Sequence, residues 1–157
     1  MFLLKISGDK MKIKLTKQSE GYCGPASLKM VLSIYGINKS ENELAKLTKT
    51  SRKKGCDEKD IVKVAKKLGL KGYVKKNSSI FEIKKLVNKG IPVIVDWFSP
   101  EEAGHYSVVV GFEKDKILIA DPHFGKVKKY RIDWFEERWF DMPFKKIIKK
   151  EIIVITK

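Results

Sequence analysis

The sequence has few cysteines and histidines and no long hydrophobic run. No apolar segment approaches the roughly 20 residues that span a bilayer. The N-terminus lacks a basic start and a cleavage site, so we expect no signal peptide and, by default, a cytoplasmic protein. Without an export signal, the two cysteines are expected to be free thiols rather than a disulfide. No C-x-x-C spacing is present, so we expect no metal site.

Arginine is also scarce, because 31 of the 34 basic residues are lysine, although the formal net charge is +15. Specific recognition of phosphates and bases favours the forked guanidinium of arginine. The lysines alternate with apolar residues, which is typical of a solvated surface. We expect no specific nucleic-acid partner and at most weak, nonspecific binding to anionic surfaces. The alternative is a functional basic face toward nucleic acid, membrane or an acidic peptide.

The 157 residues contain 43% hydrophobic and 10% aromatic residues, enough for a hydrophobic core. We expect one domain over residues 1–157, with its core at about 15–135. Residues 1–10 are expected to form an N-terminal extension with strand-like alternation at residues 2–6, and Met1 and Met11 are alternative starts.

Periodicity divides the chain midway into a helical half and a strand-rich half. Helices are expected at residues 23–35, 40–48, 57–68 and 79–90, and an aromatic-rich helical turn at 134–140. Strands are expected at residues 70–74, 92–97, 104–112, 116–121, 127–132 and 151–155. Ser40 and Ser79 each open a capping box, and the apolar run at 92–97 predicts a central strand buried on both faces. The fold class is therefore α+β, with the helical half packed on an antiparallel sheet.

A cysteine stands where the first helix begins. Residues 18–27 read Gln-Ser-Glu-Gly-Tyr-Cys-Gly-Pro-Ala-Ser, which places Cys23 at the helix N-terminus and Gln18 five residues upstream. The partial positive charge and free N–H groups of a helix N-terminus favour a thiolate. The Gln18 side-chain amide is a candidate donor to an oxyanion at the same place.

A cysteine nucleophile needs a base and a group that orients the base. Of the two histidines, His105 begins a predicted strand, whereas His123 lies in a turn. Asp121 ends the next strand, and the turn at 113–115 places it nearly opposite His105 across the hairpin. We therefore predict a Cys23–His105–Asp121 triad. No base or glutamine is patterned around Cys56, which we interpret as structural.

These motifs resemble papain-like cysteine peptidases, and most closely the stand-alone relatives of the bacteriocin-processing peptidases that cleave double-glycine leaders. The matching segments are residues 23–27, residues 104–111 (Gly-His-Tyr-Ser-Val-Val-Val-Gly) and Ile-Ala-Asp-Pro at residues 119–122. The family glutamine usually stands six residues before the cysteine, whereas Gln18 stands five before Cys23. Tyr22 also occupies a position where leader-cleaving transporter domains often carry aspartate.

The resemblance implies a papain-like fold and a cysteine peptidase that cleaves peptide amide bonds. It implies Cys23 as nucleophile, His105 as base, Asp121 as orienting group, Gln18 in the oxyanion hole, a peptide or protein substrate and no cofactor. Leader cleavage is the narrower expectation, and thiol chemistry on an amide is the broader one. The alternatives are an acyl or peptidyl transferase like phytochelatin synthase and a non-catalytic peptide-binding module.

Overall fold

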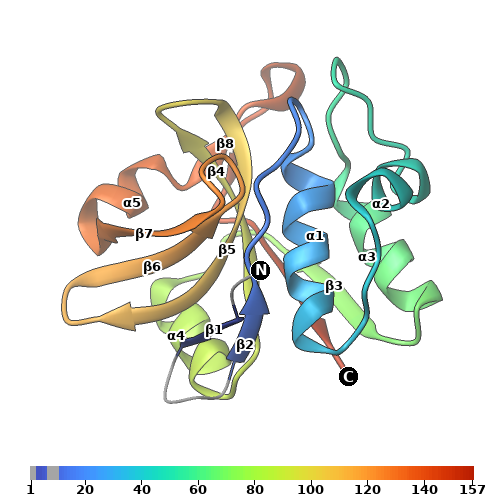
Figure 1. Ribbon diagram of the computed structural model, residues 1–157. Helices are drawn as coiled ribbons and strands as arrows, with labels where there is room; N and C mark the ends of the chain where they lie inside the picture. Colours follow the sequence, from blue (N-terminus) through green and yellow to red (C-terminus); the bar gives the residue numbers. More distant parts are fainter. Residues whose placement is uncertain (1–2, 7–10) are drawn as a thin grey trace.

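The structure, a computed structural model, describes residues 3–6 and 11–157 (Figure 1). Helices dominate the first half of the chain and strands the second, as the sequence predicts. The helices are α1 (Cys23–Ile34), α2 (Glu41–Leu47), α3 (Glu58–Lys67), α4 (Ile80–Asn88) and α5 (Ile132–Arg138). Each predicted helix is present, and α1 begins at Cys23 as predicted, although the other helix ends differ from the prediction by one or two residues.

The caps explain where the helices begin. The Ser40 hydroxyl accepts a hydrogen bond from the Glu43 backbone N–H, and the Ser79 hydroxyl accepts one from the Glu82 backbone N–H, as the predicted capping boxes require. The glutamates do not complete the boxes. Glu43 pairs with a neighbouring lysine, and Glu82 accepts hydrogen bonds from Lys75 and a serine hydroxyl. A surface lysine therefore competes with the cap for each glutamate.

One antiparallel sheet carries most of the second half of the chain. Its strands lie in the order β3 (Lys71–Lys75), β10 (Ile152–Thr156), β4 (Val93–Ser99), β5 (Ala103–Glu113), β6 (Lys116–Asp121) and β7 (Lys126–Arg131). The last strand of the chain is therefore inserted between β3 and β4. The α+β prediction is confirmed, but this strand order was not predicted.

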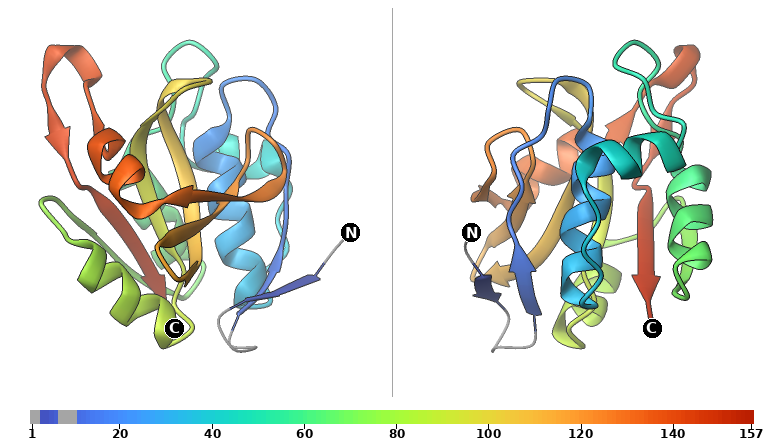
Figure 2. Two further views of the ribbon diagram at one scale, coloured as in Figure 1. Left: turned by 90° about the vertical axis from the view of Figure 1, so that its left-hand side faces the viewer. Right: turned by 45° about the vertical axis from the view of Figure 1, so that its right-hand side comes forward.

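The predicted central strand is confirmed as buried on both faces. Val93, Ile94 and Val95 in β4 are fully buried, and consecutive strand residues point to opposite faces of the sheet. Helices α1 and α4 pack on opposite sides of the neighbouring strand β5 (Figure 2). The sheet is thus a middle layer between helices. The N-terminus of α1 lies at the end of the sheet where β5 begins.

The hairpin between β5 and β6 has a shorter turn than predicted and an unpredicted bulge. Glu113 pairs with Lys116, so two residues form the turn, and a bulge near Val109 shifts the pairing so that Val108 lies opposite Ala120. Continuing that register places Asp121 opposite Ser107. The turn is one residue shorter than predicted, but the bulge offsets that difference, so Asp121 lies two residues from His105 across the ladder, as the predicted turn centre implies.

Two small hairpins complete the fold. The first pairs β1 (Leu3–Ile6) with β2 (Met11–Lys14); residue 2 of the predicted strand lies outside the described residues. The second pairs β8 (Phe140–Asp141) with β9 (Ile148–Lys149) around a 3₁₀ turn at Pro143–Lys145. The prediction of a helical turn through residue 140 is wrong at its end, because α5 stops at Arg138 and the chain continues into β8.

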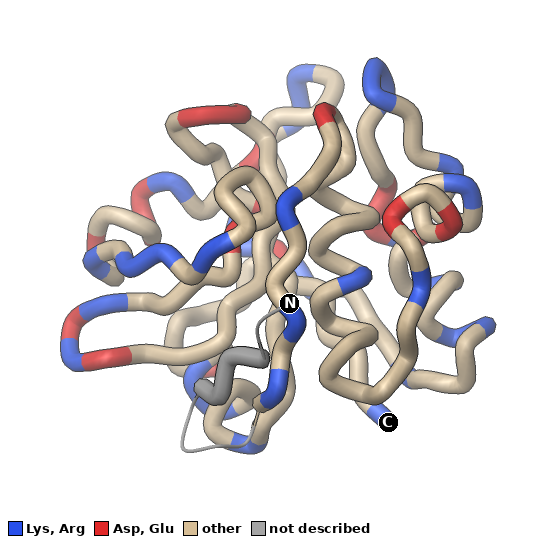
Figure 3. Tube along the Cα trace, in the orientation of Figure 1, with Lys and Arg blue, Asp and Glu red and all other residues tan. Residues whose placement is uncertain are grey.

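Basic side chains are spread along the chain. Figure 3 shows lysine and arginine on helices, strands and turns of both halves. Among the described residues, no helix combines the length and apolar character needed to cross a bilayer.

Candidate active site

Cys23 is the first residue of α1, at a helix N-terminus without a side-chain cap. The preceding residue, Tyr22, makes no side-chain cap, and the first turn contains no Asp or Glu. The N–H groups of this turn are therefore available to an anion, as the sequence predicts. Gly24 allows Cys56 to lie close to the start of α1, because a Cβ there would lie 2.8 Å from the Cys56 Sγ. The two cysteines are free thiols on neighbouring segments.

His105 and Asp121 meet across the hairpin. The His105 ring is almost fully buried, and its Nε2 lies 2.7 Å from the Asp121 Oδ1. The same carboxylate oxygen accepts a hydrogen bond of 2.9 Å from the His123 backbone N–H, which fixes its orientation. The indole of Trp97 lies behind the imidazole, with ring centroids 6.3 Å apart. Diagonal neighbours in a sheet are close enough for such side chains to meet.

His105 is held in its charged form. Burial opposes that charge, but interactions with Asp121, Cys23 and Glu102 outweigh burial and raise the His105 pKa from 6.5 to about 11. Since Asp121 engages Nε2, the other ring nitrogen, Nδ1, is the one available to Cys23. The structure therefore brings Cys23, His105 and Asp121 together in the order expected of a triad.

Gln18 lies beside the same site. Its backbone N–H donates to the Pro122 carbonyl at 2.8 Å, which ties the segment before Cys23 to the turn after Asp121. Its side-chain Nε2 donates to the Glu102 Oε1 at 3.1 Å. The five-residue spacing is compatible with this position, because Gly21 takes a left-handed φ of 75° and turns the chain sharply before the helix.

The sequence prediction missed Glu102. This side chain comes from the turn between β4 and β5, and its carboxylate bridges two predicted site residues. Glu102 accepts the Gln18 hydrogen bond and places Oε2 2.8 Å from the His105 Nδ1, at ion-pair distance but outside hydrogen-bonding geometry. Interaction with His105 lowers the Glu102 pKa below its ordinary value, despite burial. The only signal in the sequence was an acidic residue three positions before the histidine, which is too common to be diagnostic.

Cys23 and His105 open onto a cavity of about 320 Å³. Tyr106 forms part of its wall and donates a hydrogen bond to the Cys56 carbonyl, which holds the loop before α3 against the sheet. Cys56 is partly buried there, and burial raises its thiol pKa to about 11. Cys56 is therefore protonated at neutral pH, in agreement with its interpretation as structural.

Within residues 3–6 and 11–157, no three His, Cys, Asp or Glu side chains converge as metal ligands. The chemistry available to the described residues is that of a thiol, a charged imidazole, two carboxylates and an amide.

Residues 10–147 match the model of the Peptidase_C39 like family. The transport/processing ATP-binding protein ComA of Streptococcus pneumoniae is 35% identical over 119 residues, which cover 74% of this chain and 16% of ComA. The chain thus spans about one sixth of the length of this relative.

Solved structures agree in fold. The crystal structure of the peptidase domain of Streptococcus ComA superposes with a TM-score of 0.74 and 29% identity, over 91% of this chain and 97% of that domain. A double-glycine-motif protease from a transporter, solved with a leader peptide, superposes with a TM-score of 0.72 and 24% identity, over 93% and 92% of the two chains. The papain-like fold prediction is confirmed. The chain belongs to the Peptidase_C39 like family, as a papain-like cysteine peptidase of the group that includes the bacteriocin-processing peptidase domains.

Proposed function

We propose that this chain hydrolyses peptide amide bonds with Cys23 as nucleophile, His105 as acid and base, Asp121 as orienting group and Gln18 as oxyanion donor. The observation that carries the proposal is the 2.7 Å contact between the His105 Nε2 and Asp121, which leaves Nδ1 for the thiol at the helix N-terminus. The raised pKa of His105 further supports an imidazolium paired with a thiolate.

The reaction then follows from these positions. The Cys23 thiolate attacks the carbonyl carbon, and the developing oxyanion is stabilised by the Gln18 Nε2 and the N–H groups at the start of α1. The C–N bond breaks as His105 gives its proton to the leaving amine. A water molecule, deprotonated by His105, attacks the thioester and releases the carboxylic acid and the thiol. Asp121 keeps the imidazole in one tautomer and orientation throughout.

The substrate is proposed to be a peptide with glycine residues at the cleavage site. The support is the family membership and a structural neighbour described as a double-glycine-motif protease in complex with a leader peptide. The test is incubation of the protein with a peptide containing a central Gly-Gly and with its Ala-Ala counterpart, followed by mass spectrometry. We expect cleavage after Gly-Gly at a rate at least about tenfold higher than after Ala-Ala, the discrimination typical of small pockets.

Two outcomes would change this proposal. Equal cleavage of the two peptides would remove the glycine preference but retain the peptidase. A product joined to an added amine, formed in preference to the hydrolysed product, would instead identify a transferase.

Glu102 is expected to restrain activity. Its carboxylate accepts the hydrogen bond of the Gln18 side-chain amide and lies against the His105 Nδ1. The proposed reaction needs both the amide and this ring nitrogen. Replacing Glu102 with alanine should raise kcat/KM about three- to tenfold, because a partly exposed contact of this kind is worth about 0.7–1.4 kcal/mol. Since the Glu102 pKa is lowered, the carboxylate persists at neutral pH, and the gain should shrink only in acid as Glu102 becomes protonated in the wild type.

The matched control is Glu101→Ala, which removes the neighbouring exposed carboxylate and should leave kcat/KM within about twofold. A fall in kcat/KM for Glu102→Ala would contradict the restraint, since it would mean that Glu102 supports the charged imidazole during the reaction.

A further inference from the structure

The cavity beside Cys23 is acidic in a chain of strongly positive net charge. Asp57, Glu58, Asp96 and Asp141 line it, and Lys54 is the one basic residue other than His105 among its described lining residues. None of the ion pairs formed within residues 3–6 and 11–157 includes any of these four carboxyl groups. Although the chain has 31 lysines, these carboxyl groups next to Cys23 form no ion pair within the described residues.

The two deeper acids form a close pair. Asp96 is 5% exposed; burial, followed by the charge of Asp141 and a hydrogen bond with it, raises the Asp96 pKa well above its ordinary value. Asp141 lies against Gly104, the residue before His105, where a Cβ would collide with its carboxylate. The glycine thus allows a carboxylate to approach the backbone next to the proposed base. A cation that approached Asp96 would favour its charged form and so oppose this upward shift of its pKa.

A fifth carboxylate lies behind the cavity and lacks a hydrogen-bond partner within the described part of the chain. Glu151 is 1% exposed, and neither of its side-chain oxygens has a hydrogen-bond partner among the described residues. The pairing of Ile152 with Val95 continues to place Glu151 opposite Asp96, on the side of the sheet that faces the cavity. Burial, and then the charge of Glu58, raises the Glu151 pKa to about 7. A buried carboxylate without a donor is costly, and a bound cation would offset that cost.

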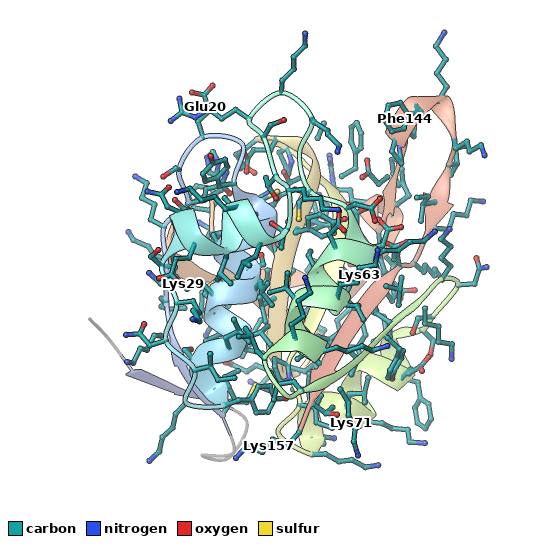
Figure 4. The ribbon with its side chains drawn as sticks, turned by 90° about the vertical axis from the view of Figure 1, so that its right-hand side faces the viewer. Glu20, Lys29, Lys63, Lys71, Phe144 and Lys157 are labelled. Atoms are coloured by element: carbon teal, nitrogen blue, oxygen red, sulfur yellow. The ribbon has the colours of Figure 1, made fainter. Side chains whose placement is uncertain are left out.

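The cavity opens toward the β8–β9 hairpin. Phe144 lines its rim at the tip of that hairpin and is 95% exposed (Figure 4). The cavity therefore combines an accessible apolar rim with carboxylates at its base. Such a shape suits a long aliphatic side chain that ends in a positive charge.

We propose that this cavity is a subsite for a cationic group of the substrate, a guanidinium or ammonium, held by Asp96, Asp141 and Glu58 and balanced by Glu151. The proposal rests on the proposed function, since it assigns a substrate feature to the same site. The cationic group belongs to a residue close to the scissile bond or to a free amino terminus, and both present the same charge to the carboxylates.

Binding can be measured without turnover, by calorimetric titration of the Cys23→Ala protein. The probes are Gly-Gly peptides that carry arginine or its neutral isostere citrulline beside the glycines, each with a free or acetylated amino terminus. We expect the arginine peptide to bind at least about tenfold more tightly than the citrulline peptide, because hydrogen bonds to charged groups contribute about 1.5 kcal/mol or more. A difference that follows the free amino terminus instead would place the chain terminus in the same subsite.

Two variants connect the preference to the cavity. Asp96→Asn preserves shape but cannot ionise, and Glu58→Gln removes a partly exposed charge at low risk to folding. Each should reduce the preference to about threefold or less, whereas Glu137→Gln, an exposed acid outside the cavity lining, should leave it unchanged. Equal binding of arginine and citrulline peptides, or an undiminished preference in both cavity variants, would overturn the subsite. Because no cleavage is measured, failure of the proposed chemistry would be visible separately in the Gly-Gly assay.

Discussion

Replacing Cys23 with alanine is expected to abolish peptide cleavage, with kcat/KM lower by at least about 10,000-fold. The proposed thioester cannot form without Sγ, and no other described side chain holds a nucleophile beside the His105 Nδ1. The substitution removes one sulfur from a partly buried position, so the protein should fold. Thermal unfolding of the variant should confirm this, and cleavage is measured with the Gly-Gly peptide.

The comparison variant is Cys56→Ala. Its thiol has a pKa raised to about 11 by burial, so it is not a thiolate at neutral pH, and its loss should reduce cleavage by less than about tenfold through changes in the cavity wall. Residual cleavage of more than a few per cent by a pure Cys23→Ala protein, or a larger loss in Cys56→Ala, would contradict the assignment of the nucleophile.

Replacing His105 with asparagine should lower kcat by about 1,000-fold or more. Asparagine can still hydrogen-bond to Asp121, but it cannot accept the thiol proton or return it to the leaving amine. Because the raised pKa keeps His105 charged up to about pH 11, wild-type activity should not fall as the pH rises through 6.5, the ordinary value for histidine. Steady-state rates between about pH 6 and 9 measure both effects.

His123 provides the matched control for this substitution. Its ring lies 6.5 Å from that of His105, and its side chain is about one third exposed. His123→Asn should keep kcat within about threefold, because only the backbone N–H of His123 contacts Asp121. Equal losses in the two variants would argue that the histidines act through general electrostatics rather than through one base.

The helices were predictable because their signals are local. Ser40, Asp57 and Ser79 cap α2, α3 and α4, and Gly36 takes the left-handed conformation after α1. The position of β10 was not predictable, because pairing of the last strand with β3 and β4 depends on contacts across the whole chain. The bulge near Val109 could not be predicted either, because its cause lies in the packing around the hairpin.

In the candidate site, too, the residues with local signals could be predicted and those that depend on distant contacts could not. Cys23 could be placed at a helix start from a short segment, and the contact of His105 with Asp121 from the position of one turn. Glu102 and the Asp96–Asp141 pair could not, because each depends on a side chain that approaches from a different strand or turn. The roles assigned to Cys23 and His105 remain predictions that the proposed variants would test.

The most direct test of the central claim, an activated Cys23 paired with His105, is the rate of alkylation of each cysteine by iodoacetamide at pH 7. Mass spectrometry of digested protein follows both thiols in one sample. We predict that Cys23 reacts at least about 100-fold faster than Cys56, and that His105→Asn removes most of the difference. Equally slow labelling of both cysteines in the wild-type protein would contradict the account.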